Sequence, residues 1–187
     1  KREPVAKIGD KTYASLDKAF AEAANGDTIT LIGNIVVAEE DFAAAGPITV
    51  GGGGTSATIT LDFDEYSIDV SGDLFEIASE SELILENASI NTDSDVITSC
   101  GGTVTVNSTS EDGIRCGRFV ASVASGGTVT INDGTIMADY STIASVPAGA
   151  SVTINGGELT GYSILLVKGG NVMKGYYKMP EATAQTI

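Results

Sequence analysis

The feature that most constrains the fold of this chain is a short phrase of alternating residues that recurs along it. In most copies, β-branched residues or leucines alternate with threonine or another polar residue, and the copy at 82–86 is a variant with Ile84 at one of the polar positions. The copies lie at 28–31, 58–62, 82–86, 103–107, 128–132 and 151–155, and a fading copy begins at 171. From Ile59 onward, the apolar positions 59, 83, 104, 129, 152 and 172 are separated by 24, 21, 25, 23 and 20 residues. Alternation of period two within a repeat of this length is typical of one coil of a β-solenoid.

Three short strands can be assigned within one repeat. In the copy that begins at 128, the first strand covers 129–131, a corner follows at 132–133, and the second strand starts at 134–136. The third strand covers 142–146, and a turn at 147–149 leads into the next copy. One unit alone cannot bury its apolar side, whereas stacked units bury a continuous column. Because crossovers between parallel strands are nearly always right-handed, the sequence predicts an all-β fold: a single right-handed parallel β-helix of about six to seven coils.

A polar side chain follows the first strand of each copy and forms a column of its own. The residues at this corner are Asp62, Glu86, Asn107, Asn132 and Asn155. Asparagine tolerates the sharp backbone conformation of a corner and can hydrogen-bond to neighbours above and below. The pattern therefore predicts a structural asparagine ladder at Asn107, Asn132 and Asn155 in preference to a ligand site.

The two ends of the chain differ from the coils, and the whole is expected to form one domain. Residues 1–27 are predicted to form a short strand and a capping helix that begins after Ser15 and ends at Asn25-Gly26. The apolar face of this helix consists of Leu16, Phe20 and Ala23. The coils occupy 28–175 and a weakly structured tail occupies 176–187. Since no second capping helix is visible, either the tail folds over the last coil or a further domain or oligomer partner covers it.

Composition excludes several classes of function. The chain carries 10 Lys and Arg against 25 Asp and Glu, a net charge of −15, and it contains no histidine. The absence of histidine removes the usual general base, the usual zinc ligand and every Ser-His or Cys-His nucleophile pair. So few cations make nucleic acid and anionic membranes poor partners. No apolar run reaches the roughly 18–20 residues of a membrane span.

The two cysteines, Cys100 and Cys116, lie 16 residues apart and could meet across one turn of a coil. Two alternatives stay open: a disulfide, or two buried thiols that behave as small apolar side chains. The second is favoured.

The N-terminal segment carries a family resemblance. Residues 5–20, which include Thr12-Tyr13-Ala14-Ser15-Leu16-Asp17-Lys18-Ala19, are followed by Asn25-Gly26-Asp27-Thr28-Ile29-Thr30-Leu31. This pattern resembles the start of pectate-lyase-like right-handed β-helix domains in secreted and surface proteins of gut bacteria. The resemblance implies an extracytoplasmic repeat module within a larger surface protein, often without known activity. Phage fibres and spikes use similar helices, so a virion setting stays open.

The sharpest catalytic candidates are Asp93 and Asp95, because Asn91-Thr92-Asp93-Ser94-Asp95 looks like the first acidic motif of polygalacturonases. In that family aspartates protonate the glycosidic oxygen and activate water. The family also needs paired aspartates, a glycine-flanked histidine and an Arg-x-Lys motif, and this chain lacks all three. A solvated polar turn is the preferred interpretation.

A pectate-type lyase would need an arginine base and bound calcium. Arg115 or Arg118 could supply the base, one coil from Asp93 and Asp95. Oxygen-rich clusters suit calcium, so adventitious or structural calcium is compatible with these aspartates or with Asp62, Asp64 and Glu65. An acidic enzyme is nevertheless poorly suited to polyanionic pectin.

Two surface features are candidates for binding. Tyr140 and Tyr162 lie 22 residues apart, one coil, and could stack on a sugar, although a ladder of packed tyrosines is the plainer interpretation. The outward face of the first strands forms a Thr-x-Thr array that resembles β-helical ice-binding surfaces, but Glu82 and Ile84 interrupt it. Threonine is also simply favourable on an exposed strand face.

These observations predict a non-catalytic extracellular or cell-surface module that acts in surface structure, adhesion or glycan contact, with a glycan or another surface protein as partner. The alternatives are a pectinase-class lyase or hydrolase and a structural protein of a phage particle.

Overall fold

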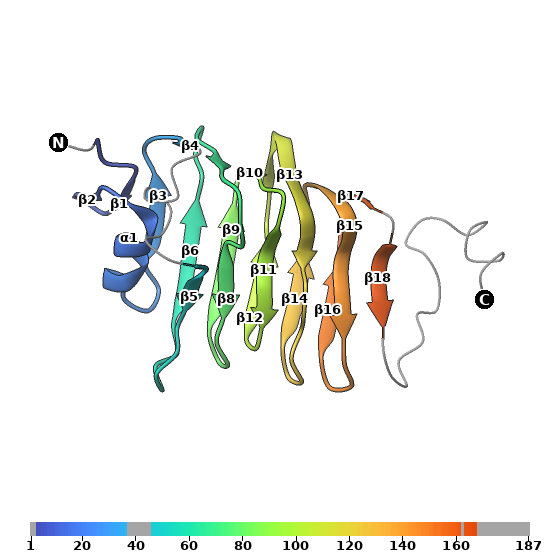
Figure 1. Ribbon diagram of the computed structural model, residues 1–187. Helices are drawn as coiled ribbons and strands as arrows, with labels where there is room; N and C mark the ends of the chain where they lie inside the picture. The colour runs from blue at the N-terminus through green and yellow to red at the C-terminus, as the bar shows by residue number, and fades with distance from the viewer. Residues whose placement is uncertain (1–2, 37–45, 162, 168–187) are drawn as a thin grey trace.

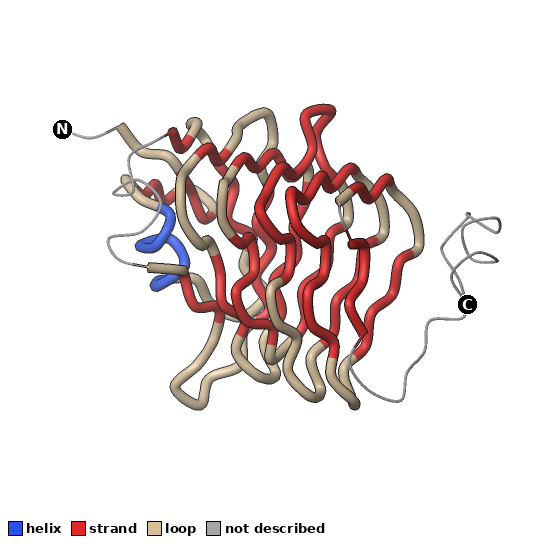
Figure 2. The backbone as a smooth tube through the Cα atoms, turned by 45° about the vertical axis from the view of Figure 1, so that its right-hand side comes forward, coloured by secondary structure: helices blue, strands red, loops and turns tan. Residues whose placement is uncertain are grey.

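The chain forms a parallel β-solenoid with one helix at its N-terminal end (Figure 1). The computed structural model describes residues 3–36, 46–161 and 163–167. Strands make up 55% and helix 5%, and the solenoid has about five turns. The predicted fold class is therefore confirmed, and Figure 2 shows the strands of successive coils side by side.

The first sheet has eight strands in the order β16-β14-β12-β9-β6-β3-β1-β2. Its strands are β1 (Ala6–Ile8), β2 (Lys11–Tyr13), β3 (Thr28–Leu31), β6 (Thr58–Asp62), β9 (Glu82–Glu86), β12 (Thr103–Val106), β14 (Thr128–Ile131) and β16 (Ser151–Ile154).

Parallel pairing joins Thr58 to Glu82, then Thr103, Thr128 and Ser151. These are the steps of 24, 21, 25 and 23 residues that the repeat predicts.

The first copy of the phrase pairs differently from the alignment by sequence. Thr28 lies opposite Thr60, and Ile29 opposite Leu61, so β3 is shifted by two residues relative to the equivalence of 28–31 with 58–61. A shift of two keeps every side chain on its own face, because strand side chains alternate with period two. Hydrophobic pattern alone therefore could not distinguish the two registers.

The described residues form fewer turns than the six to seven coils that the sequence predicts. The parallel strands β3, β6, β9, β12, β14 and β16 are six rungs, which bound five intervals, in agreement with the observed five or so turns. Counting copies of the phrase counts rungs and not the turns between them. The fading copy at 171 lies outside the described residues.

The second sheet has ten strands and contains both the second and the third strand of each repeat. Its strands are β4 (Ile35–Val36), β5 (Ile48–Val50), β7 (Ile68–Asp69), β8 (Phe75–Ile77), β10 (Ala88–Asn91), β11 (Asp95–Cys100), β13 (Thr109–Val120), β15 (Thr135–Val146), β17 (Glu158–Thr160) and β18 (Ser163–Val167).

The prediction of separate strands at 134–136 and 142–146 was wrong for this coil, because β15 is continuous from Thr135 to Val146. A register shift in the pairing with β13, between Cys116 and Arg118, lets one strand turn the corner without a loop.

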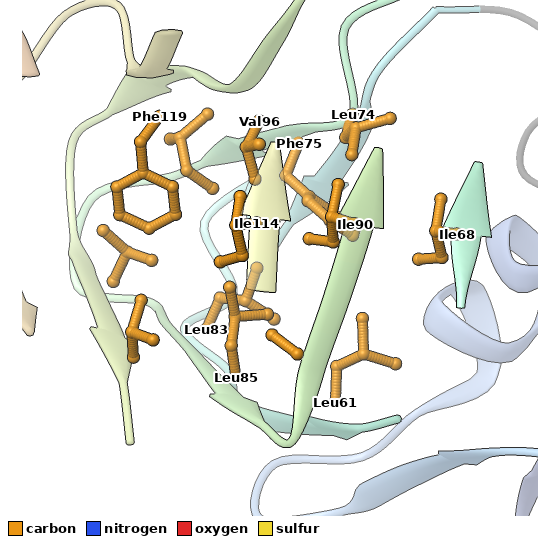
Figure 3. Close-up of a cluster of buried hydrophobic side chains, with 14 of the residues drawn as sticks. Leu61, Ile68, Leu74, Phe75, Leu83, Leu85, Ile90, Val96, Ile114 and Phe119 are labelled. Atoms are coloured by element: carbon orange, nitrogen blue, oxygen red, sulfur yellow. The ribbon is translucent and has the colours of Figure 1, made fainter. Parts of the chain in front are cut away.

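Apolar side chains from both sheets meet inside the column (Figure 3). Leu61, Leu83 and Leu85 come from the first sheet, and Ile90 and Ile114 face them from the second; each is at most 2% exposed. Full burial of one such side chain contributes about 1.5–3 kcal/mol. The alternation of the repeat is thus the pattern of core contacts.

The helix α1 (Leu16–Glu22) closes the N-terminal end, as predicted. Leu16 and Ala19 are fully buried, and the ring of Phe20 lies 5.7 Å from that of Phe75 in β8. Ser15 is the N-cap residue, but its hydroxyl donates to the Asp17 carboxylate and makes no hydrogen bond to the helix backbone. The antiparallel strand β1 covers the edge of β3, so helix and hairpin together cap the column.

Cys100 and Cys116 are free, buried thiols, which resolves the alternative that the sequence leaves open. Burial raises the pKa of Cys100 from 9.0 to about 11 and that of Cys116 to about 12. Both thiols point into the apolar column, where the thiolate form is disfavoured.

The raised thiol pKa values predict a loss of stability at alkaline pH. Since each pKa is higher in the folded than in the unfolded chain, the stabilising contribution is complete below about pH 9 and disappears as the pH rises through about 11–12. Denaturant unfolding at pH 7, 9 and 10.5 should show a decline above pH 9 that is smaller in the Cys100→Ala/Cys116→Ala variant. An equal decline in both proteins would contradict this origin.

Candidate functional site

Two adjoining depressions lie on the outer surface of the second sheet and share Asp93. Their volumes are about 280 Å³ and about 320 Å³. Asp69, Asn91 and Asp139 line the first depression. The second, here called the groove, is lined by Asp73, Asp93, Ser94, Asp95, Gly117, Arg118 and Tyr140.

The solenoid register assembles the groove from consecutive coils. Asp95 is the first residue of β11 and pairs with Arg118 of β13. Arg118 pairs in turn with Ser141 of β15, directly after Tyr140. Residues about 23 positions apart in sequence therefore lie beside one another across the coils.

A bidentate ion pair between Asp95 and Arg118 forms the centre of the groove. Arg118 donates from Nε to Asp95 Oδ1 at 2.7 Å and from Nη2 to Oδ2 at 2.9 Å. The Asp95 side chain is only 10% exposed, whereas that of Arg118 is 44% exposed. The hydrogen bond to Asp95, together with the charges of Asp95 and Asp73, raises the pKa of Arg118. The guanidinium is thus a fixed cation, which makes it a poor general base.

The other two aspartates of the groove accept backbone hydrogen bonds. Asp73 Oδ1 accepts from the amide of Asp95 at 3.1 Å, and Asp93 Oδ1 accepts from that of Gly72 at 3.3 Å. Gly117 lies against this turn, since a Cβ there would sit 2.8 Å from the carbonyl oxygen of Asp93. Both carboxylates remain exposed at the rim, where they can accept hydrogen bonds from a ligand.

Tyr140 supplies an exposed aromatic surface on the same groove. It is 66% exposed and is one of two exposed large hydrophobic residues among those the structure describes, the other being Val36. Tyr162, which the sequence predicts to stack one coil away, lies outside the described residues.

The sequence analysis did not predict that Tyr140 lies beside Arg118, and it did not identify Asp73 as part of the site. Spacing gives part of the signal, because Asp73, Asp95 and Arg118 are separated by 22 and 23 residues, one coil each, but the position of Tyr140 beside Arg118 depends on the register of the second sheet.

Arg115 is not part of the groove. It is exposed on β13, opposite Asn91 of β10 and Met137 of β15, and it lines neither depression. Of the four weak catalytic candidates, the structure brings together Asp93, Asp95 and Arg118.

The acidic residues near Asp62 do not form a metal cluster. In the described part of the chain there is no group of three or more His, Cys, Asp or Glu side chains that could hold a metal ion. The Asp62 carboxylate instead accepts hydrogen bonds at 3.0 Å from the Asp64 amide and from Asn87 Nδ2.

The corner column forms a chain of side-chain hydrogen bonds. Asn155 donates to Asn132 and Asn132 to Asn107, each at 2.7 Å. Asn107 donates in turn to Glu86 at 2.6 Å. These amides are engaged with one another from coil to coil, which is the arrangement of a structural ladder.

The threonine array lies in register on the first sheet. Thr103, Thr128 and Ser151 form one outward row, and Thr105, Thr130 and Thr153 form the next. Glu82 and Ile84 continue the two rows, and Glu82 accepts a hydrogen bond from Thr105 at 3.2 Å. The array is therefore interrupted at β9, as the sequence indicates.

Comparison with family models, with curated proteins and with solved structures gave no match. Within the described residues, no helix has the length and apolar character needed to cross a membrane.

Proposed function

We propose that this protein is a non-catalytic β-solenoid module that contacts glycans through the groove, in an extracellular or cell-surface setting. The observation that carries the proposal is the exposed ring of Tyr140 beside the Asp95–Arg118 pair in one depression. A further support is the resemblance of residues 5–20 and 25–31 to the start of β-helix domains in secreted and surface proteins of gut bacteria.

The chemistry of the groove suits a sugar. A tyrosine ring offers apolar area to the C–H face of a pyranose and ends in a polar hydroxyl. The rim carboxylates of Asp73 and Asp93 can accept hydrogen bonds from hydroxyl groups, and charge-assisted bonds of this kind are the stronger ones. The ion pair holds Arg118 in place before any ligand arrives, which reduces the entropy cost of binding.

A pectinase-class activity is less well supported by the same geometry. Asp95 has both carboxylate oxygens bound to Arg118, so it is not free to activate water. Arg118 has a raised pKa and would have to release a proton to act as a lyase base. No specific observation favours a phage-particle role over a cell-surface one.

The test is glycan binding with Tyr140→Ala. Wild-type protein screened on a glycan array should bind at least one oligosaccharide, and calorimetry with that ligand should show about a fivefold to thirtyfold weaker Kd for the variant, since loss of one aromatic contact costs about 1–2 kcal/mol.

Val36→Ala is the matched control, because it truncates the other exposed large apolar side chain among the described residues. It should leave Kd unchanged. Equal losses in both variants, or depolymerisation of the bound glycan that disappears in Asp93→Asn, would contradict a non-catalytic groove.

A further inference from the structure

We propose that the groove selects glycans by charge, so that it prefers amino sugars with free ammonium groups, accepts neutral sugars and rejects uronic acids. This inference rests on the proposed glycan contact and specifies its ligand class.

The first argument is the balance of charges around Asp93. The two depressions that share this residue are lined by five aspartates and one arginine among the described residues: Asp69, Asp73, Asp93, Asp95, Asp139 and Arg118. The charge of Arg118 is matched by Asp95 through two hydrogen bonds. Among the described residues of these linings, no cation accompanies the other four carboxylates, so a ligand carboxylate there would meet like charges.

The second argument is the position of Tyr140, the one aromatic ring that the described residues contribute to these linings. Tyr140 is exposed and lines the groove together with Arg118, Asp73 and Asp93. The face of a tyrosine ring attracts cations through its quadrupole. A pyranose stacked on this ring would direct an amino substituent toward carboxylates, whereas a uronate would direct its charge toward the same groups. Ring and carboxylates therefore favour the same ligand charge.

The experiment compares three β-1,4-linked tetrasaccharides that share one pyranose backbone and differ in the charge of one substituent per sugar: glucosamine carries an ammonium group at C2, glucose is neutral, and glucuronic acid carries a carboxylate at C6. Calorimetry is performed on the full chain at a mildly acidic pH at which the amines of the glucosamine ligand are protonated and the carboxylates of the glucuronate ligand are ionised. At about 0.02 M salt we expect Kd to weaken about twofold to fivefold at each step from glucosamine to glucose to glucuronate. At about 0.5 M salt the three values should converge, while the glucose value stays nearly constant.

Matched variants separate the groove from the overall charge of the protein. The Asp73→Asn/Asp93→Asn variant keeps the acceptor oxygens and removes two charges, so it should reduce the differences in Kd among the three tetrasaccharides. The Asp64→Asn/Glu65→Gln variant removes two exposed charges at a corner outside the groove and should leave the differences in Kd unchanged. Asparagine also tolerates the φ of +51° at position 64.

A flat or reversed ranking in wild type, or equal flattening by both variants, would overturn charge selection while leaving glycan contact intact. Failure of all three sugars to bind, with no ligand found on the array, would overturn the proposed function as well.

Discussion

Replacing Phe75 by alanine is expected to lower the free energy of unfolding by about 3–5 kcal/mol, which corresponds to a fall in Tm of about 6–20 °C. Phe75 is fully buried in β8 and pairs with Ile48 of β5 on one side and Ile97 of β11 on the other. Its ring also meets Phe20 of the capping helix at 5.7 Å and an interplanar angle of 52°. The substitution thus opens a cavity inside the column and loosens the contact that holds the cap. Thermal unfolding followed by circular dichroism measures the effect.

Phe20→Ala and the double variant provide the control. Phe20 is only half-buried, so its substitution should cost less than that of Phe75. If the two rings act together, the double variant should be less destabilised than the sum of the two single variants by about 0.5–1.5 kcal/mol. Strict additivity would show that the helix is held by Leu16 and Ala19 without help from this ring pair.

Much of the fold could be predicted because the alternation of residues within each repeat and the spacing of the repeats indicate how the strands are buried and paired. Val129 and Ile131 alternate with threonines, and this alternation fixes which side of the strand is buried; the structure buries both completely. The spacing of the copies then fixes the pairing of β6, β9, β12, β14 and β16. These are local signals, and stacking simply repeats them.

The parts that could not be predicted depend on backbone detail between the copies. The merging of two predicted strands into β15 depends on a register shift near Arg118, for which hydrophobic pattern carries no signal. The two-residue offset of β3 keeps the same faces buried, so the hydrophobic pattern of the sequence does not distinguish it from the unshifted pairing.

The site was predicted in pieces and not as a whole. Asp93 and Asp95 were identified by motif and Tyr140 by spacing, but their meeting depends on the step from Asp95 to Arg118 to Ser141 across three coils. Sequence spacing gives the coil on which a residue lies. The position of that residue around the coil follows only when the register of the second sheet is known.

A second large effect is expected from Gly102→Ala, which should cost about 3 kcal/mol and lower Tm by about 6–12 °C. Gly102 is buried where one coil closes and β12 begins. A Cβ on this residue would lie 2.1 Å from the carbonyl oxygen of Ser81 and 2.4 Å from that of Ala78, both on the coil below. The Ser81 oxygen also accepts the hydrogen bond from the Thr103 amide that begins the ladder between β9 and β12. Relief of the clash must therefore push two coils apart or break that ladder.

Gly33→Ala is the matched control, because a Cβ at Gly33 would make only ordinary contacts at 3.6 Å or more. This variant should be neutral or more stable by up to about 1 kcal/mol, since alanine reduces the freedom of the unfolded chain. Equal losses of Tm in the two variants would contradict a steric origin.

The requirement for glycine should recur one coil later, where a Cβ on Gly127 would lie 2.3 Å from the carbonyl oxygen of Cys100. Its neighbour Gly126 has open space around it but a φ of +89°. Within the pair at 126–127, the first glycine therefore serves the turn and the second serves the close approach of stacked coils.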